Sequence, residues 1–274
     1  MTQLGKETGR PVWFLLTDRP TDDDRWRRLM DGVRAARAQG AMVTAQVAGR
    51  PVGVLLGADT ALNPFSIRPS YQPLLALPIA ERMARLRDPA MRAEILADRP
   101  SEALMKPLSQ FRQHIVRRWH RMFKLGNPPD YEPPASASIA AIAEREGRTP
   151  DEVAYDYLAA DPTNFIFFPV TGYNVDNHDV IREMLTSEET VLALSDGGAH
   201  CSSILDAGMP TWMITHWARD RHRGPRLPLE LIVKRQTSET AGFFGLHDRG
   251  VLAPGKKADV NIIDYAGLQV QKPE

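Results

Sequence analysis

The strongest constraint on the fold is a strand–helix–strand pattern near the start of the chain. Val12 to Thr17 and Met42 to Val47 are short apolar runs that suit buried strands. Between them, Asp22 to Gln39 repeats apolar side chains at helical spacing and begins with acidic residues, which favour the positive end of a helix dipole. Two strands joined by a helix predict parallel pairing, because a parallel connection needs a crossover of roughly a dozen residues.

The same alternation returns in the second half of the chain. Asn164 to Val170 and Thr190 to Leu194 are predicted strands, and Ala258 to Asp264 is a last short one. The predicted helices of this half cover Ile139 to Glu146, a segment that begins at Thr149, Asn177 to Leu185, Pro228 to Gln236 and Glu239 to Phe244.

Residues 48–134 break this pattern with many prolines, arginines and short apolar pairs. A region of this length between regular units is typical of an insertion that covers another part of the fold. We therefore predict a helical insertion over about residues 57–135, with helices at Ile79 to Arg87, Ala90 to Ala97 and Ser109 to Phe123. A complete eightfold barrel takes about 250 residues. The predicted fold class is thus α/β, with about half of a (β/α)8 TIM-like barrel.

Charge and composition exclude several classes of partner. The chain has 34 Lys plus Arg residues and 34 Asp plus Glu residues, so its formal net charge is zero. This charge balance gives no reason to expect binding to nucleic acid or to an anionic membrane. The arginine-rich stretch Arg112 to Arg121 is interpreted as a solvated helix face. No apolar run reaches the length of a membrane span, and the lone Cys201 cannot form a disulfide within the chain. These features predict a cytoplasmic protein.

The sharpest chemical signal is the sequence SDGGAH, from Ser195 to His200, where an apolar strand ends in a glycine turn. Asp196 is predicted to lie at the C-terminal end of a barrel strand, on the face that carries active sites in such folds. A carboxylate there can bind a metal or take a proton from water, and the alternative is a turn aspartate bonded to its own backbone. His200 can ligate a metal, accept a proton or make a polar contact at the mouth of the site.

The other histidines form no recognised metal motif, since neither His-x-His nor His-Glu-x-x-His occurs. A Gly-x-Ser-x-Gly nucleophile turn and a phosphate-binding glycine loop are absent too. Cys201 is interpreted as inert packing. The remaining histidines are interpreted as surface or hydrogen-bonded polar residues: His114, His120, His178, His216, His222 and His247.

Three segments near the C-terminus form a longer signature: SDGGAH from Ser195, LELIVKRQTSETAGFFGL from Leu229 and DRGVLAPGKKADVNIID from Asp248. Upstream pieces fit the same pattern, namely ETGRPVWF, AQVAGRPVG, FSIRPSYQPL and LGNPPDYEPP. Together they resemble the amidohydrolase superfamily, most closely its D-aminoacylase, or N-acyl-D-amino-acid deacylase, group. The resemblance runs along nearly the whole chain.

The resemblance implies a distorted (β/α)8 barrel of the metal-dependent hydrolase type, with a metal, usually zinc, at the C-terminal strand ends. Asp196 matches the aspartate that takes the proton of the attacking water and passes it to the leaving amine, and it is also a possible metal ligand. Residues 1–255 then correspond to the partial barrel, and residues 256–274 to the start of a C-terminal β-sandwich segment.

The sequence departs from the family pattern at the metal site. The His-x-His pair and the bridging ligand are absent, and Thr17 and Gln46 stand about where relatives place two further histidines. Asp196 is therefore the only family ligand present. Because catalytic zinc sites use about three protein ligands, we expect that this chain alone does not retain zinc and that it is truncated at both ends.

Three hypotheses follow. In the first, the chain is part of an enzyme that deacylates N-acyl-D-amino acids or related small amides, and Arg50, Tyr173, Asn174 and His200 contact the substrate or serve the structure. In the second, it is an inactive or split fragment that acts as a binding module. Its open sheet edges then favour self-association or a complementing N-terminal half. In the third, it is a barrel hydrolase for cyclic amides or guanidines.

Overall fold

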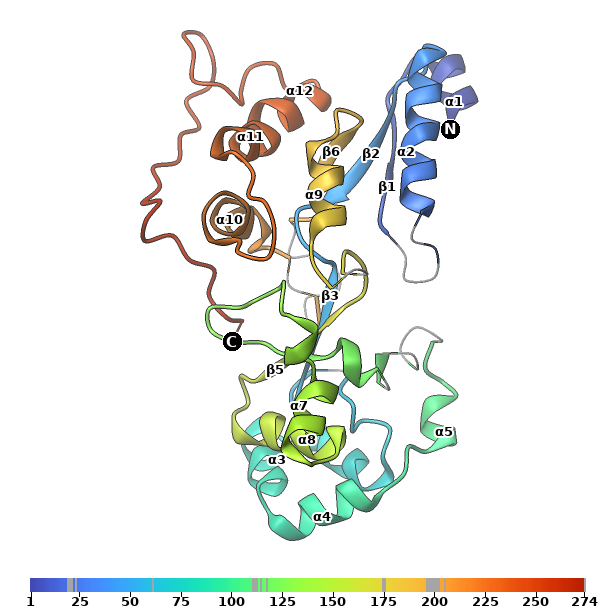
Figure 1. The fold of residues 1–274 in the computed structure, drawn as a ribbon, viewed down its shortest axis with the longest axis vertical. Helices are drawn as coiled ribbons and strands as arrows, with labels where there is room; N and C mark the ends of the chain where they lie inside the picture. The colour runs from blue at the N-terminus through green and yellow to red at the C-terminus, as the bar shows by residue number, and fades with distance from the viewer. Residues whose placement is uncertain are drawn as a thin grey trace. The chain divides into compact units, whose positions relative to one another are not determined.

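The computed structural model describes residues 1–18, 22, 24–60, 62–109, 113, 115–116, 118–173, 176–195, 203–204 and 206–273. The chain forms two compact units. Unit 1 comprises residues 1–52, 171–197 and 206–270, and unit 2 comprises residues 53–170, 198–205 and 271–274. Figure 1 traces the elements of both along the chain.

A three-stranded parallel sheet lies at the centre of unit 1. It consists of β1 (Val12–Leu15), β2 (Val43–Ala48) and β6 (Thr190–Ala193), in the order β1-β2-β6. Phe14 stands opposite Ala45, and Gln46 opposite Val191. The parallel pairing predicted for the first two strands is confirmed, and β2 is the most buried of the three because it has a neighbour on each side.

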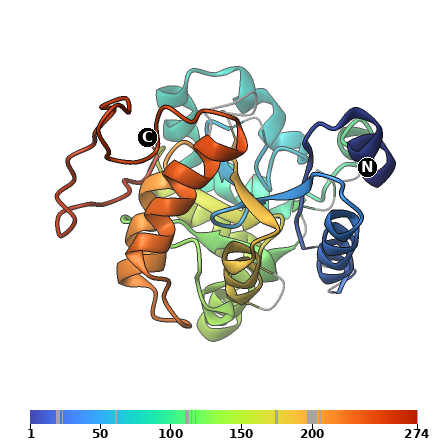
Figure 2. The same cartoon turned by 90° about the horizontal axis from the view of Figure 1, so that it is seen from above.

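Helices pack against this sheet. α2 (Arg25–Ala38) buries the apolar stripe that its sequence predicts and packs against β2, and Figures 1 and 2 show it beside β1 and β2. α9 (Asp179–Thr186) packs against both β2 and β6. The other helices of unit 1 are α1 (Thr2–Thr8), α10 (Met209–Trp212), the π-helix η4 (Met213–Asp220), α11 (Leu229–Lys234), the π-helix η5 (Arg235–Glu239) and α12 (Thr240–Phe243).

The predicted return strand from Ala258 to Asp264 is wrong. Residues 244–273 form neither helix nor strand, and Figures 1 and 2 draw residues 244–270 as an irregular red trace. The segment keeps its strand-like apolar pattern, but Ile262 is 99% exposed and Val260 is 54% exposed. A strand forms only where another strand pairs with its backbone, and none of the described strands pairs with this segment.

Unit 2 contains an antiparallel sheet of β3 (Gly53–Gly57), β5 (Phe165–Pro169) and β4 (Phe123–Lys124), in that order. The predicted strand from Asn164 to Val170 is therefore present, but its partners are antiparallel instead of the parallel neighbours of a barrel. Gly53 permits this pairing, because a Cβ at that position would come within 2.1 Å of the Phe167 ring. The partner strand β3 lies in a region that the sequence analysis left without a predicted element.

Short helices surround this sheet: η1 (Pro69–Ala76), α3 (Ile79–Leu86), α4 (Pro89–Ala97), α5 (Glu102–Met105), η2 (Trp119–Arg121), η3 (Ala135–Ala137), α7 (Ile139–Glu146) and α8 (Pro150–Ala160). They enclose a hydrophobic core that includes Leu56, Ile95 and Ile166, each 0% exposed. The helix predicted over 109–123 is wrong at its end, because Phe123 begins β4 and pairs with Phe167. Several residues of that stretch lie outside the described part.

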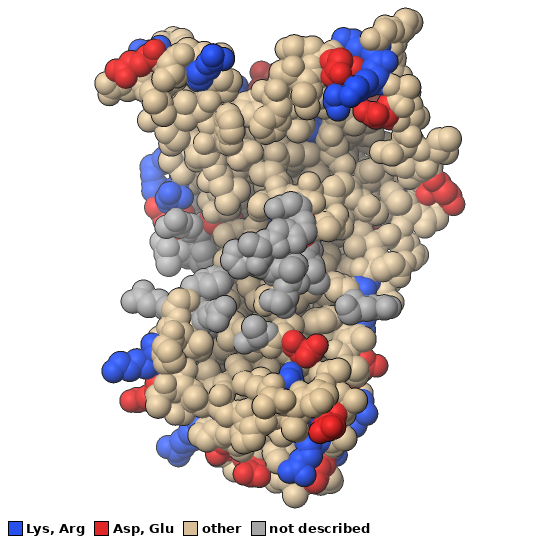
Figure 3. All heavy atoms as spheres, turned by 180° about the vertical axis from the view of Figure 1, so that it is seen from behind, with Lys and Arg blue, Asp and Glu red and all other residues tan. Residues whose placement is uncertain are grey.

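Charged groups of both signs lie side by side on the surface. Figure 3 shows Lys and Arg next to Asp and Glu on the face it draws, with no wide area of one sign. None of the helices that the described residues form is long and apolar enough to cross a lipid bilayer.

Candidate functional site

The carboxyl ends of the three parallel strands of unit 1 meet at one edge of the sheet, which is where α/β folds place their functional groups. Asp18 follows β1 at this edge and is 1% exposed. Its Oδ1 accepts a hydrogen bond from the backbone N–H of Gly172. Gly172 has φ +79° and no space for a Cβ beside Ile181, so the Asp18 carboxylate holds a segment that only glycine fits.

Arg50 follows β2 at the same edge and is 4% exposed. Its Nη2 lies 3.1 Å from Oδ1 of Asp206, whose side chain is 6% exposed, and its Nη1 donates to the Pro51 carbonyl at 3.4 Å. The guanidinium is thus a buried charge with a buried counter-charge. Its predicted contact with a substrate stays a prediction.

Two histidines and three aromatic residues form a compact group in unit 1, which we call the histidine–aromatic cluster: Tyr173, His178, Trp212, His216 and Trp217. The ring centroids of the two histidines are 5.4 Å apart. Trp212 stacks on His216 at 4.1 Å with an interplanar angle of 12°. His178 and Trp217 are 0% exposed and Tyr173 is 1% exposed, so most of the cluster is buried.

Local backbone structure positions these side chains. His178 is the N-cap residue of α9. His216 and Trp217 lie in the π-helix η4, where the Arg221 N–H donates to the His216 carbonyl at 2.8 Å. The Trp217 indole N–H donates to the Gly49 carbonyl at 2.7 Å, which ties η4 to the end of β2. The cluster therefore lies at the carboxyl edge of the sheet.

A buried arginine, Arg221, packs against the Trp217 side of the cluster. The Arg221 guanidinium lies 4.8 Å from the Trp217 ring centroid, and its side chain is 0% exposed. It donates to Asp179 Oδ1 at 2.7 Å, so an acidic residue in the first turn of α9 balances its charge. This ion pair links the start of α9 to the end of η4 and fixes the two elements that carry the histidines.

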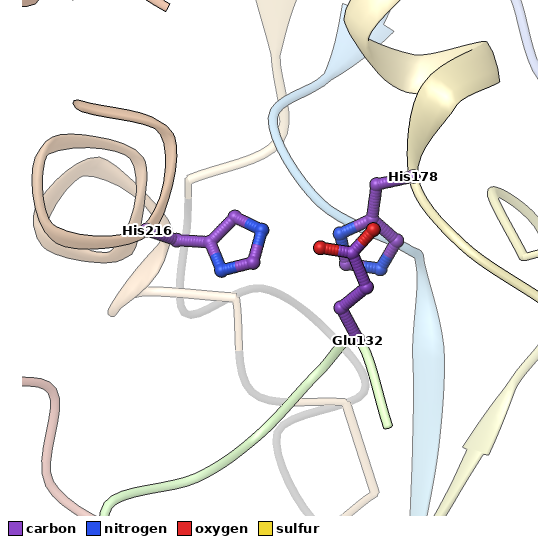
Figure 4. A group of neighbouring side chains, drawn as sticks. All are labelled: Glu132, His178 and His216. Carbon is purple, nitrogen blue, oxygen red and sulfur yellow. The ribbon is translucent and has the colours of Figure 1, made fainter. Parts of the chain in front are cut away.

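The two imidazoles are the part of the cluster that fits a metal. Each offers a ring nitrogen, and these two nitrogens lie within 4.8 Å of each other. Figure 4 shows the two rings facing one another from different elements. Imidazole nitrogen suits zinc and its neighbours in the first transition series, so the donor set fits the metal that the family resemblance implies. The pair supplies two of the three protein ligands that a catalytic site uses.

Unit 2 holds a buried carboxylate of its own in Glu132. Glu132 is 2% exposed, and its backbone N–H donates to Asp130 Oδ1 at 2.8 Å. It lies in the proline-rich loop that precedes η3, within the region predicted to be an insertion.

The predicted site residues have different outcomes. Asp196, His200 and Asn174 lie outside the described residues. Tyr173 is in the histidine–aromatic cluster, and Arg50 is at the predicted strand end. The interpretation of the remaining histidines as surface or hydrogen-bonded residues missed that His178 and His216 face each other. No motif joins these two positions, although the two tryptophans that flank His216, in WMITHW, indicate an apolar surrounding.

Comparisons with known proteins identify relatives. A family model described as "Amidohydrolase family" matches residues 2–274. Among solved structures, a D-aminoacylase with a binuclear metal centre has a TM-score of 0.43 and 18% identity, and the match covers 94% of this chain and 41% of that one. An N-acyl-D-glutamate deacylase from Bordetella bronchiseptica, in complex with zinc and a phosphonate inhibitor, has a TM-score of 0.42, 18% identity and the same coverage. The chain thus spans 41% of the length of these proteins. No curated protein matches it.

Proposed function

The chain belongs to the amidohydrolase family, and from this premise we propose that it is part of a metal-dependent hydrolase that removes the acyl group from N-acyl-D-amino acids or related amides. The observation that carries the proposal is the family match along residues 2–274. The parallel sheet supports the proposal as well, because its carboxyl edge carries Asp18, Arg50 and the histidine–aromatic cluster. Active sites of α/β enzymes lie at that edge.

The proposed chemistry is hydrolysis of a carbon–nitrogen bond. A bound zinc ion would supply Lewis acidity and lower the pKa of a water molecule. Asp196, which follows β6 in the sequence, takes a proton from the attacking water and gives it to the leaving amine. The water oxygen bonds to the acyl carbon, the carbon–nitrogen bond breaks, and the products are a carboxylate and a free amino acid.

Substrate contacts are proposed for Arg50, Tyr173, Asn174 and His200. Arg50 already faces a carboxylate in Asp206, so its charge is partly compensated before any anionic substrate binds. Tyr173 belongs to the buried cluster, and its proposed partner is the apolar part of the acyl group. The proposed partner of Arg50 is the α-carboxylate of the substrate, which would compete with Asp206 for the guanidinium.

The domain proposal follows the family: residues 1–255 as a partial barrel with an insertion over about residues 57–135, and residues 256–274 as the start of a sandwich segment. A complementing N-terminal half, in the cytoplasm, would supply the missing strands and metal ligands. A second candidate function is a non-catalytic association module. The exposure of Leu252 (81%) and Ile262 (99%) favours it, because apolar side chains in water favour association.

The test of the proposed activity is hydrolysis of a panel of N-acetyl-D-amino acids by the zinc-supplemented protein, assayed alone and together with an N-terminal half from a family member, with the L-enantiomers as a stereochemical control. Loss of a general base removes roughly 10²–10⁴-fold of catalysis, so Asp196→Asn should lower kcat/KM by at least about 100-fold. Asp259→Asn, on an exposed position, serves as the matched control and should leave kcat/KM unchanged. Wild-type kcat/KM in Asp196→Asn would refute the assigned role, and no turnover of any amide by the wild-type protein would favour the association module.

A further inference from the structure

We infer that His178 and His216 together bind a divalent transition-metal ion within unit 1. The inference rests on the geometry of the histidine–aromatic cluster and holds whether or not the protein hydrolyses amides. It places metal ligands at the start of α9 and in η4, in a chain that has Thr17 and Gln46 where the family resemblance expects strand-end histidines. Neither histidine was among the residues predicted to bind a metal.

The distance between the imidazoles suits a shared ion. Zinc binds histidine nitrogen at about 2.0–2.1 Å with tetrahedral angles, which places two ligating nitrogens about 3.4 Å apart. The nitrogens of His178 and His216 lie within 4.8 Å of each other without a metal. Small ring rotations within the packing of the cluster would bring the nitrogens to this separation, because terminal torsions of histidine are broad.

The surroundings hold both rings in place for binding. The lone pair of an imidazole nitrogen lies in the ring plane, so Trp212, which stacks on the face of His216, does not itself cover the direction in which a metal would bind. Trp217 contacts the same ring edge-to-face at 5.3 Å and is itself held by Gly49. His178 is flanked by Tyr173 and Trp212 at 6.3 and 5.6 Å. Positions fixed in this way lose little conformational entropy when a metal binds.

The backbone that carries His216 is unusual in a way that points to function. The residues from Met213 to Asp220 form a π-helix, a conformation that is rare and appears mostly as short stretches near functional sites. Trp212, at the end of α10, stacks on His216 four residues later, so the start of η4 keeps these two rings on one face. The indole–Gly49 hydrogen bond and the Arg221–Asp179 ion pair fix both ends of this stretch.

The chemistry of the cluster selects the type of ion. Two nitrogen donors within an aromatic shell suit Zn²⁺, Cu²⁺ or Ni²⁺, whereas Mg²⁺ and Ca²⁺ prefer oxygen donors. Water would fill the remaining coordination positions.

The first experiment measures metal binding to the full chain after treatment with a chelator. Titration with ZnCl₂ in a calorimeter should give one equivalent of tight binding, and CoCl₂ should give the visible absorption of a tetrahedral site. His178→Gln and His216→Gln should each weaken zinc binding by more than the roughly 10–100-fold typical of losing an outer partner of a metal ligand. His222→Gln and His247→Gln, at exposed positions, are matched controls and should bind zinc as the wild type does.

A second measurement guards against misfolding, since His178 is fully buried and its substitution can disturb packing. X-ray absorption at the zinc edge of the wild-type protein should show two imidazole ligands at about 2.0–2.1 Å. Fewer than two imidazoles, no stoichiometric zinc, or unchanged affinity in both variants would each overturn the inference. Zinc held by both histidines in a protein without amidase activity would uphold it while the proposed function fails.

Discussion

Arg50 and Asp206 carry opposite charges into the interior of unit 1, where their side chains are 4% and 6% exposed. Breaking such a pair leaves the other charge buried without compensation, whereas replacing both with apolar residues is often tolerated. Sequence reasoning placed Arg50 correctly at a strand end, but it did not identify Asp206, because no local pattern links the two positions.

We expect Asp206→Asn to lower the free energy of unfolding by about 3 kcal/mol, measured by urea denaturation of the whole chain. The double variant Arg50→Met/Asp206→Leu should regain most of that loss. The control is Asp59→Asn, which removes the exposed partner of Arg82 and should cost less than about 1 kcal/mol. Equal effects of Asp206→Asn and Asp59→Asn would show that burial of the Arg50–Asp206 pair has no energetic consequence.

At the scale of single elements, local sequence signals predicted the helices well. α8 begins at Pro150, with the predicted Thr149 as its N-cap residue. The Thr149 side chain accepts from the Glu152 N–H at 3.2 Å, and the Glu152 side chain accepts from the Thr149 N–H at 2.8 Å. α7 ends at Gly147 in the left-handed conformation, as its sequence indicates. Such caps involve residues a few positions apart, so a sequence reveals them directly.

Thr149→Ala should lower the free energy of unfolding by about 1 kcal/mol, because the cap hydrogen bond is lost. Hydrogen bonds from the Thr149 backbone and then its hydroxyl hold the pKa of Glu152 below its ordinary value of 4.5. A carboxyl with a lowered folded-state pKa stabilises the protein above its unfolded pKa, and that contribution disappears as the pH falls through the folded-state value.

Denaturation of wild type and Thr149→Ala between pH 7 and pH 3 checks this second effect. The difference in stability between the two proteins should shrink toward acid pH, where Glu152 is protonated in both. Glu152→Gln, which keeps a side chain of the same shape, is the companion variant and should show less pH dependence than the wild type. A difference that grows on acidification would contradict the assigned hydrogen bonds.

The antiparallel direction of β5 and the π-helix η4 were not predictable from such local signals. The strand β5 is apolar enough to be recognised, but its antiparallel pairing depends on β3, more than a hundred residues earlier in the chain. In the same way, the sequence from Met213 to Asp220 has an ordinary amphipathic pattern, and only packing against Gly49 and Asp179 shows how the π-helix is held. Partners that are distant in sequence decide both features.

At the scale of the whole molecule, an exposed apolar C-terminal segment distinguishes unit 1. Leu252, Val260 and Ile262 are 81%, 54% and 99% exposed. Some of this segment borders a groove of about 730 Å³, which Val233, Val251 and Ile263 help to line. Exposed apolar side chains of this kind favour association between molecules.

We expect Leu252→Lys and Ile262→Lys to leave the free energy of unfolding within about 0.5 kcal/mol of the wild type, because neither side chain is packed. Both variants should reduce concentration-dependent self-association, measured by light scattering over a range of protein concentrations. Ile232→Lys, at a position that is 1% exposed, is the contrasting control and should unfold the protein. Destabilisation by Ile262→Lys of the size seen for Ile232→Lys would show that the segment is packed in solution.

The sequence alone was enough to predict the family, the α/β class, the parallel pairing of the first two strands and the start of α8. These features depend on motifs and on neighbours a few residues apart. The tertiary structure decided the antiparallel partners of β5, the lack of a return strand at 258–264 and the meeting of His178 with His216. Each of these depends on groups that are far apart along the chain, and contact between them follows only when the backbone has folded and buried them together.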